Sequence, residues 1–245
     1  MNMVQIYAHR GSSGTHPENT LPAFAEAVRV GSDGIELDVH LSADGQIVVM
    51  HDEEVDRTTN GKGLLREKTL EEIKKLNAGS WFSKDFSAAK VPTLKEVLNL
   101  LLQKNYRGVL MIELKTDKYE YPQIEEKVSA LLQQSWPFEH GYCSFNLASL
   151  ERMAKLEPDV QLDVLTGTSK NKIMYAKENK FIEGVHPKKT WLQEQPEQLG
   201  IFDKPIRPWT INTEEEINWC YGLGVTGIIT DYPERAIRLK QFMKK

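Results

Sequence analysis

The sequence predicts a closed (β/α)8 barrel, the TIM barrel of the α/β class. Short apolar runs typical of buried strands alternate with helical patterns along most of the chain. Strands joined by helices pair in parallel through right-handed crossovers, and a chain of 245 residues suits one α/β barrel. An open doubly wound sheet is the alternative, although the chain has no glycine fingerprint for a dinucleotide and no Walker loop. Eight parallel strands are expected, beginning near residues 4, 34, 109, 141, 160, 181, 206 and 226.

The first strand, 4–8, ends at the loop His9-Arg10-Gly11. The spacing of apolar residues predicts a helix over 21–30, with Asn19 or Thr20 as its N-cap. Residues 34–52 then predict a strand, an Asp44-Gly45 turn and an antiparallel return strand over 48–51.

Residues 53–92 differ from the rest of the chain because they are charged and rich in turns, with one short helix near 70–76. We interpret them as a small insertion near the barrel mouth, within a single catalytic domain that spans 1–245. After it the alternation resumes. The remaining helices are expected at 93–103, 121–134, 147–156, 169–178, 192–199, 213–221 and 233–243, between strands at 109–115, 141–145, 160–165, 181–185, 206–211 and 226–230.

The hairpin at 34–52 carries the first candidate site. Alternation along a strand places Glu36, Asp38 and His40 on one face. Two carboxylates so close together are costly to bury unless a cation lies between them, and Mg²⁺ and Ca²⁺ prefer oxygen ligands. The return strand brings His51 to within about one residue of the level of Glu36.

The active site of such a barrel lies at the carboxyl ends of its strands. There Glu113 would add a third acid, while Arg10 and Lys115 would add two cations that favour an anionic substrate. Two imidazoles, His9 and His51, suit paired proton transfer near neutral pH. Together these groups predict metal-assisted phosphoryl transfer to water or to a hydroxyl of the substrate itself.

These residues lie in motifs that together resemble the glycerophosphodiester phosphodiesterase family. The motifs are HRG at 9–11, PENT at 17–20, ELDV at 36–39, HD at 51–52, ELK at 113–115, SFN at 144–146, WT at 209–210 and GIITDYP at 227–233. They cover nearly the whole chain in order, and 53–92 matches the family's small inserted segment in place and size.

The resemblance implies a TIM barrel that hydrolyses glycerophosphodiesters to an alcohol and sn-glycerol 3-phosphate. It implies one divalent ion, Mg²⁺ or Ca²⁺, on Glu36, Asp38 and Glu113, with His9 and His51 as the acid–base pair. Arg10 and Lys115 would bind the phosphate, and Glu18 and Asn19 would shape the site. A departure from the family pattern is His16, which stands where many members have a small or apolar residue.

Other residues favour structural roles. His40 is expected to be structural or at the rim, and His140 and His186 to have no chemical role. Cys143 is expected to be a small buried residue, and Thr230-Asp231 a helix cap before Pro233. Phe145 favours packing, and Trp209 either fills the barrel or forms a wall for the glycerol moiety.

Composition narrows the class of protein. A net charge of −4 argues against nucleic acid as a partner. Two cysteines fit a reducing compartment, and the N-terminus lacks the pattern of a signal peptide, so we expect a cytoplasmic protein without a membrane span that binds a small-molecule substrate. Two alternatives remain at this stage: a barrel that cleaves intact phospholipids, and a non-catalytic barrel that binds a phosphate ligand.

Overall fold

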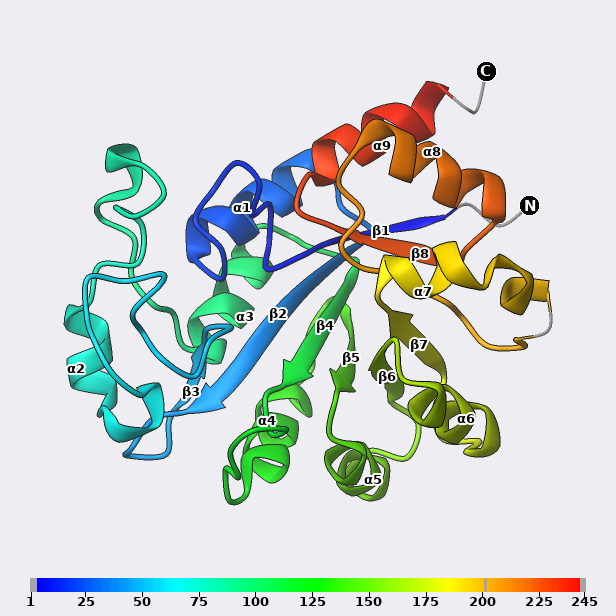
Figure 1. The fold of residues 1–245 in the computed structure, drawn as a ribbon. Helices are drawn as coiled ribbons and strands as arrows, with labels where there is room; N and C mark the ends of the chain where they lie inside the picture. Colours follow the sequence, from blue (N-terminus) through cyan, green and yellow to red (C-terminus); the bar gives the residue numbers. More distant parts are fainter. Residues whose placement is uncertain (1–3, 201, 243–245) are drawn as a thin grey trace.

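The chain folds into the predicted TIM barrel, shown in Figure 1 as a computed structural model that describes residues 4–200 and 202–242. The sheet has the strand order β7-β6-β5-β4-β2-β1-β8, with β3 paired antiparallel to β2 and the other pairings parallel. The strands are β1 Gln5–Ala8, β2 Gly34–Leu41, β3 Ile47–Val49, β4 Val109–Leu114, β5 Glu139–Ser144, β6 Gln161–Gly167, β7 Gly184–Pro187 and β8 Gly227–Thr230.

The extended segment 205–211 closes the barrel between β7 and β8. On one side the backbone N–H of Arg207 donates to Val185, and on the other the N–H of Ile229 donates to Pro208, each over 3.0 Å. Because Pro205 and Pro208 have no N–H to donate, the ladder along this segment is interrupted. The strand predicted at 206–211 is therefore present as isolated bridges to Val185 and Lys188 on the β7 side and as single hydrogen bonds to β8.

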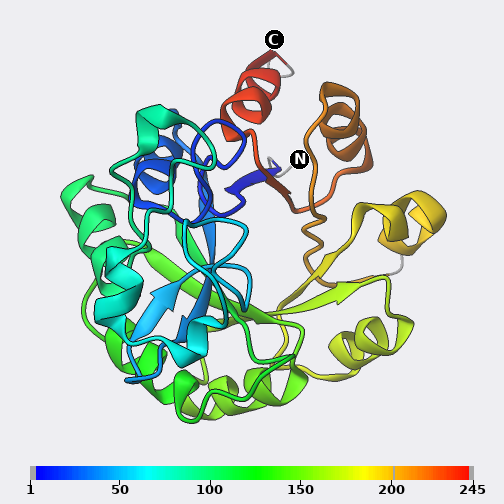
Figure 2. The ribbon, with the colours of Figure 1, turned by 60° about the vertical axis from the view of Figure 1, so that its left-hand side comes forward.

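Helices surround the strands, as Figure 2 shows along the barrel. Most bounds lie close to those predicted from apolar spacing. The helices are α1 Leu21–Val30, α2 Leu70–Lys75, α3 Leu94–Gln103, α4 Ile124–Leu132, α5 Leu147–Leu156, α6 Lys170–Glu178, α7 Lys189–Glu194, α8 Glu214–Leu223 and α9 Pro233–Phe242, with 3₁₀ turns η1 Leu65–Glu67, η2 Lys84–Phe86 and η3 Pro196–Gly200.

Two predicted bounds are wrong, both near the seventh strand. The helix expected at 192–199 begins earlier, at Lys189, and ends before Pro196, which cannot continue the hydrogen-bond ladder of an α-helix. The strand expected at 181–185 is β7, Gly184–Pro187. The apolar residues Phe181 and Ile182 instead form part of the turn after α6 and pack against the core between sheet and helices.

The barrel has two apolar layers. One lies between the strands and the helices, and contains Ile35, Leu37 and Val39 of β2. A smaller cluster lies inside the barrel: Tyr7, Met111, Cys143, Leu165 and Ile229. Gly34 is required beside Tyr7, because a Cβ there would lie 2.2 Å from the tyrosine ring.

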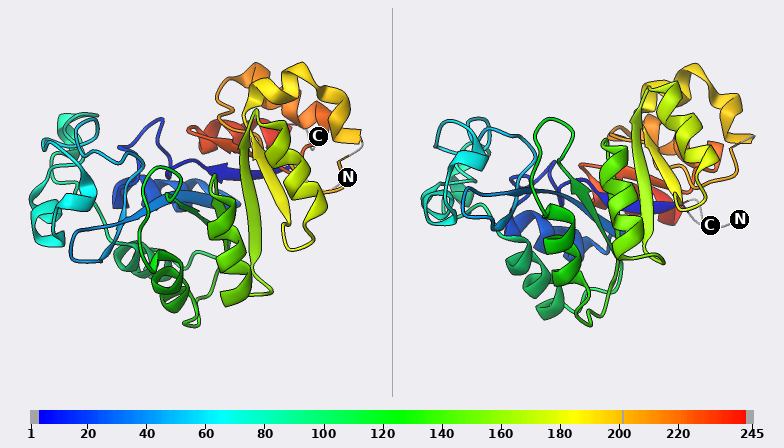
Figure 3. Two further views of the ribbon diagram at one scale, coloured as in Figure 1. Left: turned by 60° about the horizontal axis from the view of Figure 1, so that its bottom comes forward. Right: turned by 90° about the horizontal axis from the view of Figure 1, so that it is seen from below.

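The segment 53–92 lies beside the carboxyl end of β2 and contains η1, α2 and η2 (Figures 1 and 3). Its buried residues Val55, Leu65 and Ile73 pack in a separate cluster with Val48 and Met50 of the return strand. The segment is thus anchored to the same hairpin that carries the candidate acids. Among residues 4–200 and 202–242, no helix is both long enough and apolar enough to cross a membrane.

Candidate active site

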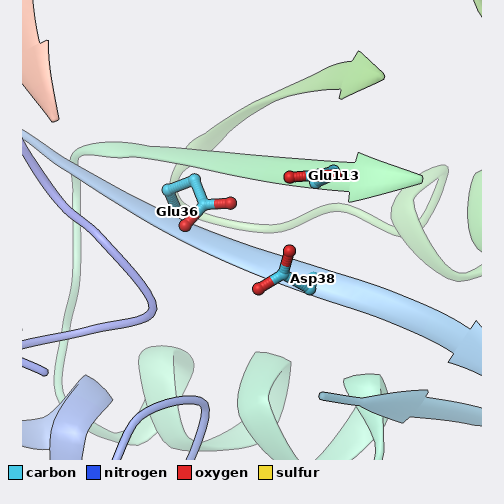
Figure 4. A group of neighbouring side chains, drawn as sticks. All are labelled: Glu36, Asp38 and Glu113. Carbon is cyan, nitrogen blue, oxygen red and sulfur yellow. The ribbon is translucent and has the colours of Figure 1, made fainter. Parts of the chain in front are cut away.

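Three carboxyl groups meet where β2 and β4 approach the mouth of the barrel. Asp38 and Glu113 are neighbours in the β2–β4 register, and Glu36 lies on the same face of β2. One oxygen from each lies within 4.8 Å of the others. Figure 4 shows the three side chains together, with Glu36 and Asp38 on one face of β2 as strand alternation predicts. All three side chains are buried.

Burial of three acids at this spacing shifts their pKa values apart. Burial, with the charge of Asp38 close by, raises the pKa of Glu36 well above its usual range and that of Glu113 to about 8. Burial would also raise the pKa of Asp38, but Arg10 and Lys115 outweigh it and hold that pKa below its usual range. The acids therefore share a site that favours a bound cation.

The two cations predicted for the rim are present, and both contact the acids. Lys115 Nζ lies 2.9 Å from Glu113 Oε1 and 3.8 Å from Asp38 Oδ1, while Arg10 Nε lies 3.6 Å from Asp38 Oδ2. If all three acids ionise, Arg10 and Lys115 offset only two of the three negative charges, and the cluster keeps a net negative charge. Asp38 Oδ1 is buried without a hydrogen-bond partner, which leaves that oxygen available to a metal. The set of donors thus fits Mg²⁺ or Ca²⁺.

Glu18 and Asn19 support this cluster from the loop before α1. Glu18 Oε1 accepts a hydrogen bond from Arg10 Nη1 over 2.7 Å, and Asn19 Nδ2 donates to Asp38 Oδ2 over 2.8 Å. The N-cap of α1 is Thr20, without a side-chain capping bond. The side chain of Asn19 is therefore free to orient Asp38.

His9 lies beside the acids, and its ring is oriented by Asp231. Its Nδ1 is 2.6 Å from Asp231 Oδ1. Burial would raise the pKa of Asp231, but bonds from His9 and Asn212 lower it to about 2, so the carboxylate accepts and His9 Nδ1 carries the proton. The second ring nitrogen, Nε2, is therefore available for proton transfer. Burial, and then Arg10, lower the pKa of His9 itself.

The role of Asp231 corrects the sequence prediction of a helix cap. Its Oδ1 accepts bonds from His9 and Ser13, and its Oδ2 accepts one from Asn212 Nδ2 over 2.6 Å. The signal was the position of Asp231 after β8. Since Ala8 pairs with Thr230 where the barrel closes, the next residues along, His9 and Asp231, become neighbours.

His51 is oriented in the same way by the residue that follows it. Its Nδ1 lies 2.6 Å from Asp52 Oδ1, whose pKa is lowered, against burial, by bonds from His51 and Arg57. The β2–β3 register pairs Val39 with Val49, which returns His51 to about the level of Glu36, as predicted.

His40 is structural, as expected. It is fully buried, with Nδ1 2.9 Å from the Tyr121 hydroxyl and Nε2 3.2 Å from the carbonyl oxygen of His51. Since a carbonyl only accepts, Nε2 donates and the hydroxyl of Tyr121 donates to Nδ1. Burial lowers the pKa of His40 to about 4, so the ring is neutral.

One cavity joins both candidate catalytic imidazoles to two of the acids, Glu36 and Glu113, while Asp38 and Lys115 lie behind its wall. It is lined by His9, Arg10, Glu36, His51, Glu113, Cys143, Phe145, Leu165, His186, Trp209 and Ile229. Trp209 stands with its ring edge-on to Phe145, at 6.2 Å between centroids, and its indole N–H donates to the carbonyl of His186 over 2.9 Å. Trp209 and Phe145 therefore line the cavity as well as pack, and His186, for which no role was predicted, also reaches it.

Comparison with known proteins identifies the relatives of this arrangement. The family model described as "Glycerophosphoryl diester phosphodiesterase family" matches residues 9–235. The chain belongs to this family. The resemblance seen in its motifs is thus confirmed, as is the prediction of an enzyme.

Curated relatives match over nearly their whole length. A glycerophosphodiester phosphodiesterase of Bacillus altitudinis is 40% identical over 247 residues, covering 99% of this chain and 100% of the relative. One from Caldanaerobacter subterraneus is 39% identical, covering 96% of each chain.

A solved structure also matches the fold. It is an Oleispira antarctica phosphodiesterase in complex with the product sn-glycerol-3-phosphate, which is 30% identical, with a TM-score of 0.86 over 98% of this chain and 97% of that one.

Proposed function

We propose that the protein hydrolyses glycerophosphodiesters to an alcohol and sn-glycerol 3-phosphate, with one divalent metal ion and a pair of histidines. Two oriented imidazoles that share one cavity with Glu36 and Glu113, which cluster with Asp38, support this most directly. The product in the Oleispira antarctica structure is consistent with it. The two alternatives, cleavage of intact phospholipids and non-catalytic binding of a phosphate ligand, have no comparable support.

Glu36, Asp38 and Glu113 would hold Mg²⁺ or Ca²⁺. When bound, the ion would supply positive charge to the phosphate oxygens, worth several kcal/mol in the transition state. Arg10 and Lys115 would bind the remaining phosphate charge from the same side, with Glu18 and Asn19 holding Arg10 and Asp38 in place.

His9 and His51 would transfer the protons. Each ring holds a proton on Nδ1 toward an aspartate, so each presents Nε2 to the cavity. One, with Nε2 unprotonated, would take the proton of the attacking water or glycerol hydroxyl, and the other, protonated on Nε2 as well as Nδ1, would give its Nε2 proton to the departing alkoxide. Trp209 would form a wall for the organic part of the substrate.

Substitution of each histidine by alanine tests the mechanism. His9→Ala and His51→Ala should each lower kcat by about 10²- to 10⁴-fold on a glycerophosphodiester such as glycerophosphocholine. His140→Ala is the matched control. His140 lies at the start of β5, pairs with Glu157 and does not line the cavity. Near-full activity of either site variant would end the assignment.

The metal requirement has its own test. EDTA should abolish hydrolysis, and Mg²⁺ or Ca²⁺ should restore it. A panel of glycerophosphodiesters assayed with each metal would identify the preferred alcohol, with phospholipid vesicles as the comparison substrate. Activity that survives exhaustive chelation would contradict the proposal.

We also propose that the chain forms one catalytic domain, with 53–92 as an insertion beside the mouth, and that it works in the cytoplasm. The two cysteines, Cys143 and Cys220, are free and buried, which fits a reducing compartment.

A further inference from the structure

Arg57, in the segment 53–92, joins two parts of the candidate site that the sequence leaves unconnected. Its Nη1 and Nη2 donate to Glu18 over 2.7 and 2.8 Å. Its Nε and Nη2 donate to Asp52 over 2.6 and 3.1 Å. One guanidinium thus grips two carboxylates at once, the geometry for which arginine is suited and lysine is not.

Each carboxylate held by Arg57 in turn holds a residue that faces the cavity. Glu18 accepts a bond from Arg10, which lies beside Asp38, and Asp52 accepts the Nδ1 proton of His51. A continuous chain of charged hydrogen bonds therefore runs from Arg10 through Glu18, Arg57 and Asp52 to His51.

The backbone on either side of Arg57 is fixed. Val55 is fully buried in the cluster that anchors the segment, and Thr58 and Thr59 are buried on the other side. The hydroxyl of Thr59 donates to the carbonyl of Val55 over 2.6 Å, closing a turn around Arg57. Because Val55 packs with Val48 and Met50 after β2, the backbone from which Arg57 extends is anchored by the core of the segment, and the guanidinium is held by Glu18 and Asp52.

Arg57 itself is not part of the cavity wall, and its side chain is 46% exposed. A surface ion pair of this exposure contributes little to stability when it stands alone. Its partners are less exposed, at 12% for Glu18 and 27% for Asp52. The consequence of losing Arg57 should therefore appear in the orientation of Asp52 and Glu18 more than in the fold.

We propose that Arg57 is a positioning residue, through which the segment 53–92 holds His51 and Arg10 in register with each other. It acts on His51 through Asp52, which fixes the ring with Nε2 toward the cavity, and on Arg10 through Glu18. This inference rests on the proposed roles of His51 and Arg10. It gives the segment a part in the reaction without any contact with substrate.

The test begins with Arg57→Ala assayed on glycerophosphocholine with metal present. Partners that orient a reacting group typically contribute about 10- to 100-fold, and we expect kcat to fall by that factor through His51. KM should rise because Arg10 is held less well. Lys62→Ala is the matched control, since Lys62 is a cation of the same segment, 84% exposed and paired with Asp56. It should keep wild-type kcat and KM.

Three further measurements separate positioning from loss of folding. The thermal midpoint of Arg57→Ala should stay close to that of the wild type. Added guanidinium ion should restore part of its kcat, since the site is open to solvent, and should leave Lys62→Ala unchanged. Arg57→Lys should recover little, because an ammonium cannot hold both carboxylates.

A double-mutant cycle with His51→Ala decides the route. If Arg57 acts through His51, Arg57→Ala should cost much less kcat in the His51→Ala background than in the wild type. Full activity of Arg57→Ala, or an equal loss of kcat in both backgrounds, would overturn the inference while leaving the histidine mechanism intact. Near-full activity of His51→Ala would instead overturn the mechanism and this inference with it.

Discussion

Two walls of the barrel bury charged side chains, and they balance those charges differently. The wall of β2 and β4 sets three acids against Arg10 and Lys115. The wall formed by β6, β7 and the segment 205–211 sets one buried acid, Asp163, against Arg207 and His186, at 2.8 and 2.9 Å from its Oδ2, with the half-exposed Glu183 at 3.8 Å from Arg207. Both walls contain buried atoms without hydrogen-bond partners, so the balance of charge is what separates them.

The pKa values follow the balance. On the β2 and β4 wall, burial and mutual repulsion raise the pKa of Glu36 and Glu113. On the other wall, Arg207 outweighs burial and lowers the pKa of Asp163. An excess of buried acids is destabilising unless a cation binds between them, whereas a paired acid is part of the scaffold. The comparison predicts opposite responses when one acid is neutralised on each wall.

The largest effect should come from Glu36→Gln. We expect loss of activity by at least about 1,000-fold, because a proposed ligand of the ion is removed. The free energy of unfolding of the metal-free protein should hold or rise, because the variant no longer buries a third acid. Hydrolysis assays and urea unfolding in EDTA measure the two quantities. If Glu36→Gln were much less stable than the wild type, Glu36 would not be part of an excess of buried acids.

Asp163→Asn should do the reverse. It leaves the buried guanidinium of Arg207 with only the half-exposed carboxylate of Glu183, at 3.8 Å, and removing one partner of a buried pair costs about 3–5 kcal/mol. Urea unfolding at neutral pH is the measurement. Activity per folded molecule should fall far less than in Glu36→Gln, and equal stability to the wild type would show that the pair is not structural.

The gain in the free energy of unfolding on adding the metal ion should also differ between variants of the two walls, and this difference is smaller than the two above. With Mg²⁺ or Ca²⁺ at about 100 times its Kd, the folded state gains about 2.7 kcal/mol. Thermal unfolding with and without the ion should show that gain in the wild type and in Asp163→Asn. Glu36→Gln should show little of it, and an undiminished shift in that variant would place the ion elsewhere.

The smallest effect concerns Asp231, which orients His9. Its pKa of about 2 lies below the usual 3.8, because bonds from His9 and Asn212 outweigh burial. The folded state therefore favours the ionised form, which contributes about 2 kcal/mol above pH 4 and loses it as pH falls toward 2. Asp231→Asn should lose this contribution at pH 7, and its deficit in urea unfolding should shrink below pH 4. A deficit independent of pH would contradict this origin.

The sequence predicts the acids of the site better than the partners of the histidines. Glu36 and Asp38 follow from strand alternation, which depends only on neighbours along the chain, and Glu113 follows from the expectation that the carboxyl ends of barrel strands meet. Asp231 could not be assigned that way, because its contact with His9 exists only where the last strand closes against the first. Asp52 was part of a recognised motif, but its hydrogen bond to His51 depends on side-chain orientation.

The same distinction separates correct and wrong element bounds. Helix α5 was predicted at its observed bounds, since its apolar period is unbroken. Strand β7 was misplaced because Phe181 and Ile182 are apolar for another reason: they pack outside the sheet after α6. Arg57 lay outside every motif used, because an exposed arginine in a charged loop has no sequence signature until its two partners are placed.

The residues that line the barrel mouth come from two separate stretches of the chain, and this has a consequence for how substrate preference could change among related enzymes. Acids, cations and imidazoles come from residues 9–57 and 113–115, with Asp231 joining them from the far end. The opposite side of the opening, from Cys143 to Trp209, contributes mostly apolar surface, with His186 as its one titratable imidazole in the cavity lining. Mutations that reshape the second stretch could therefore exchange one departing alcohol for another while the hydrolytic apparatus stays intact.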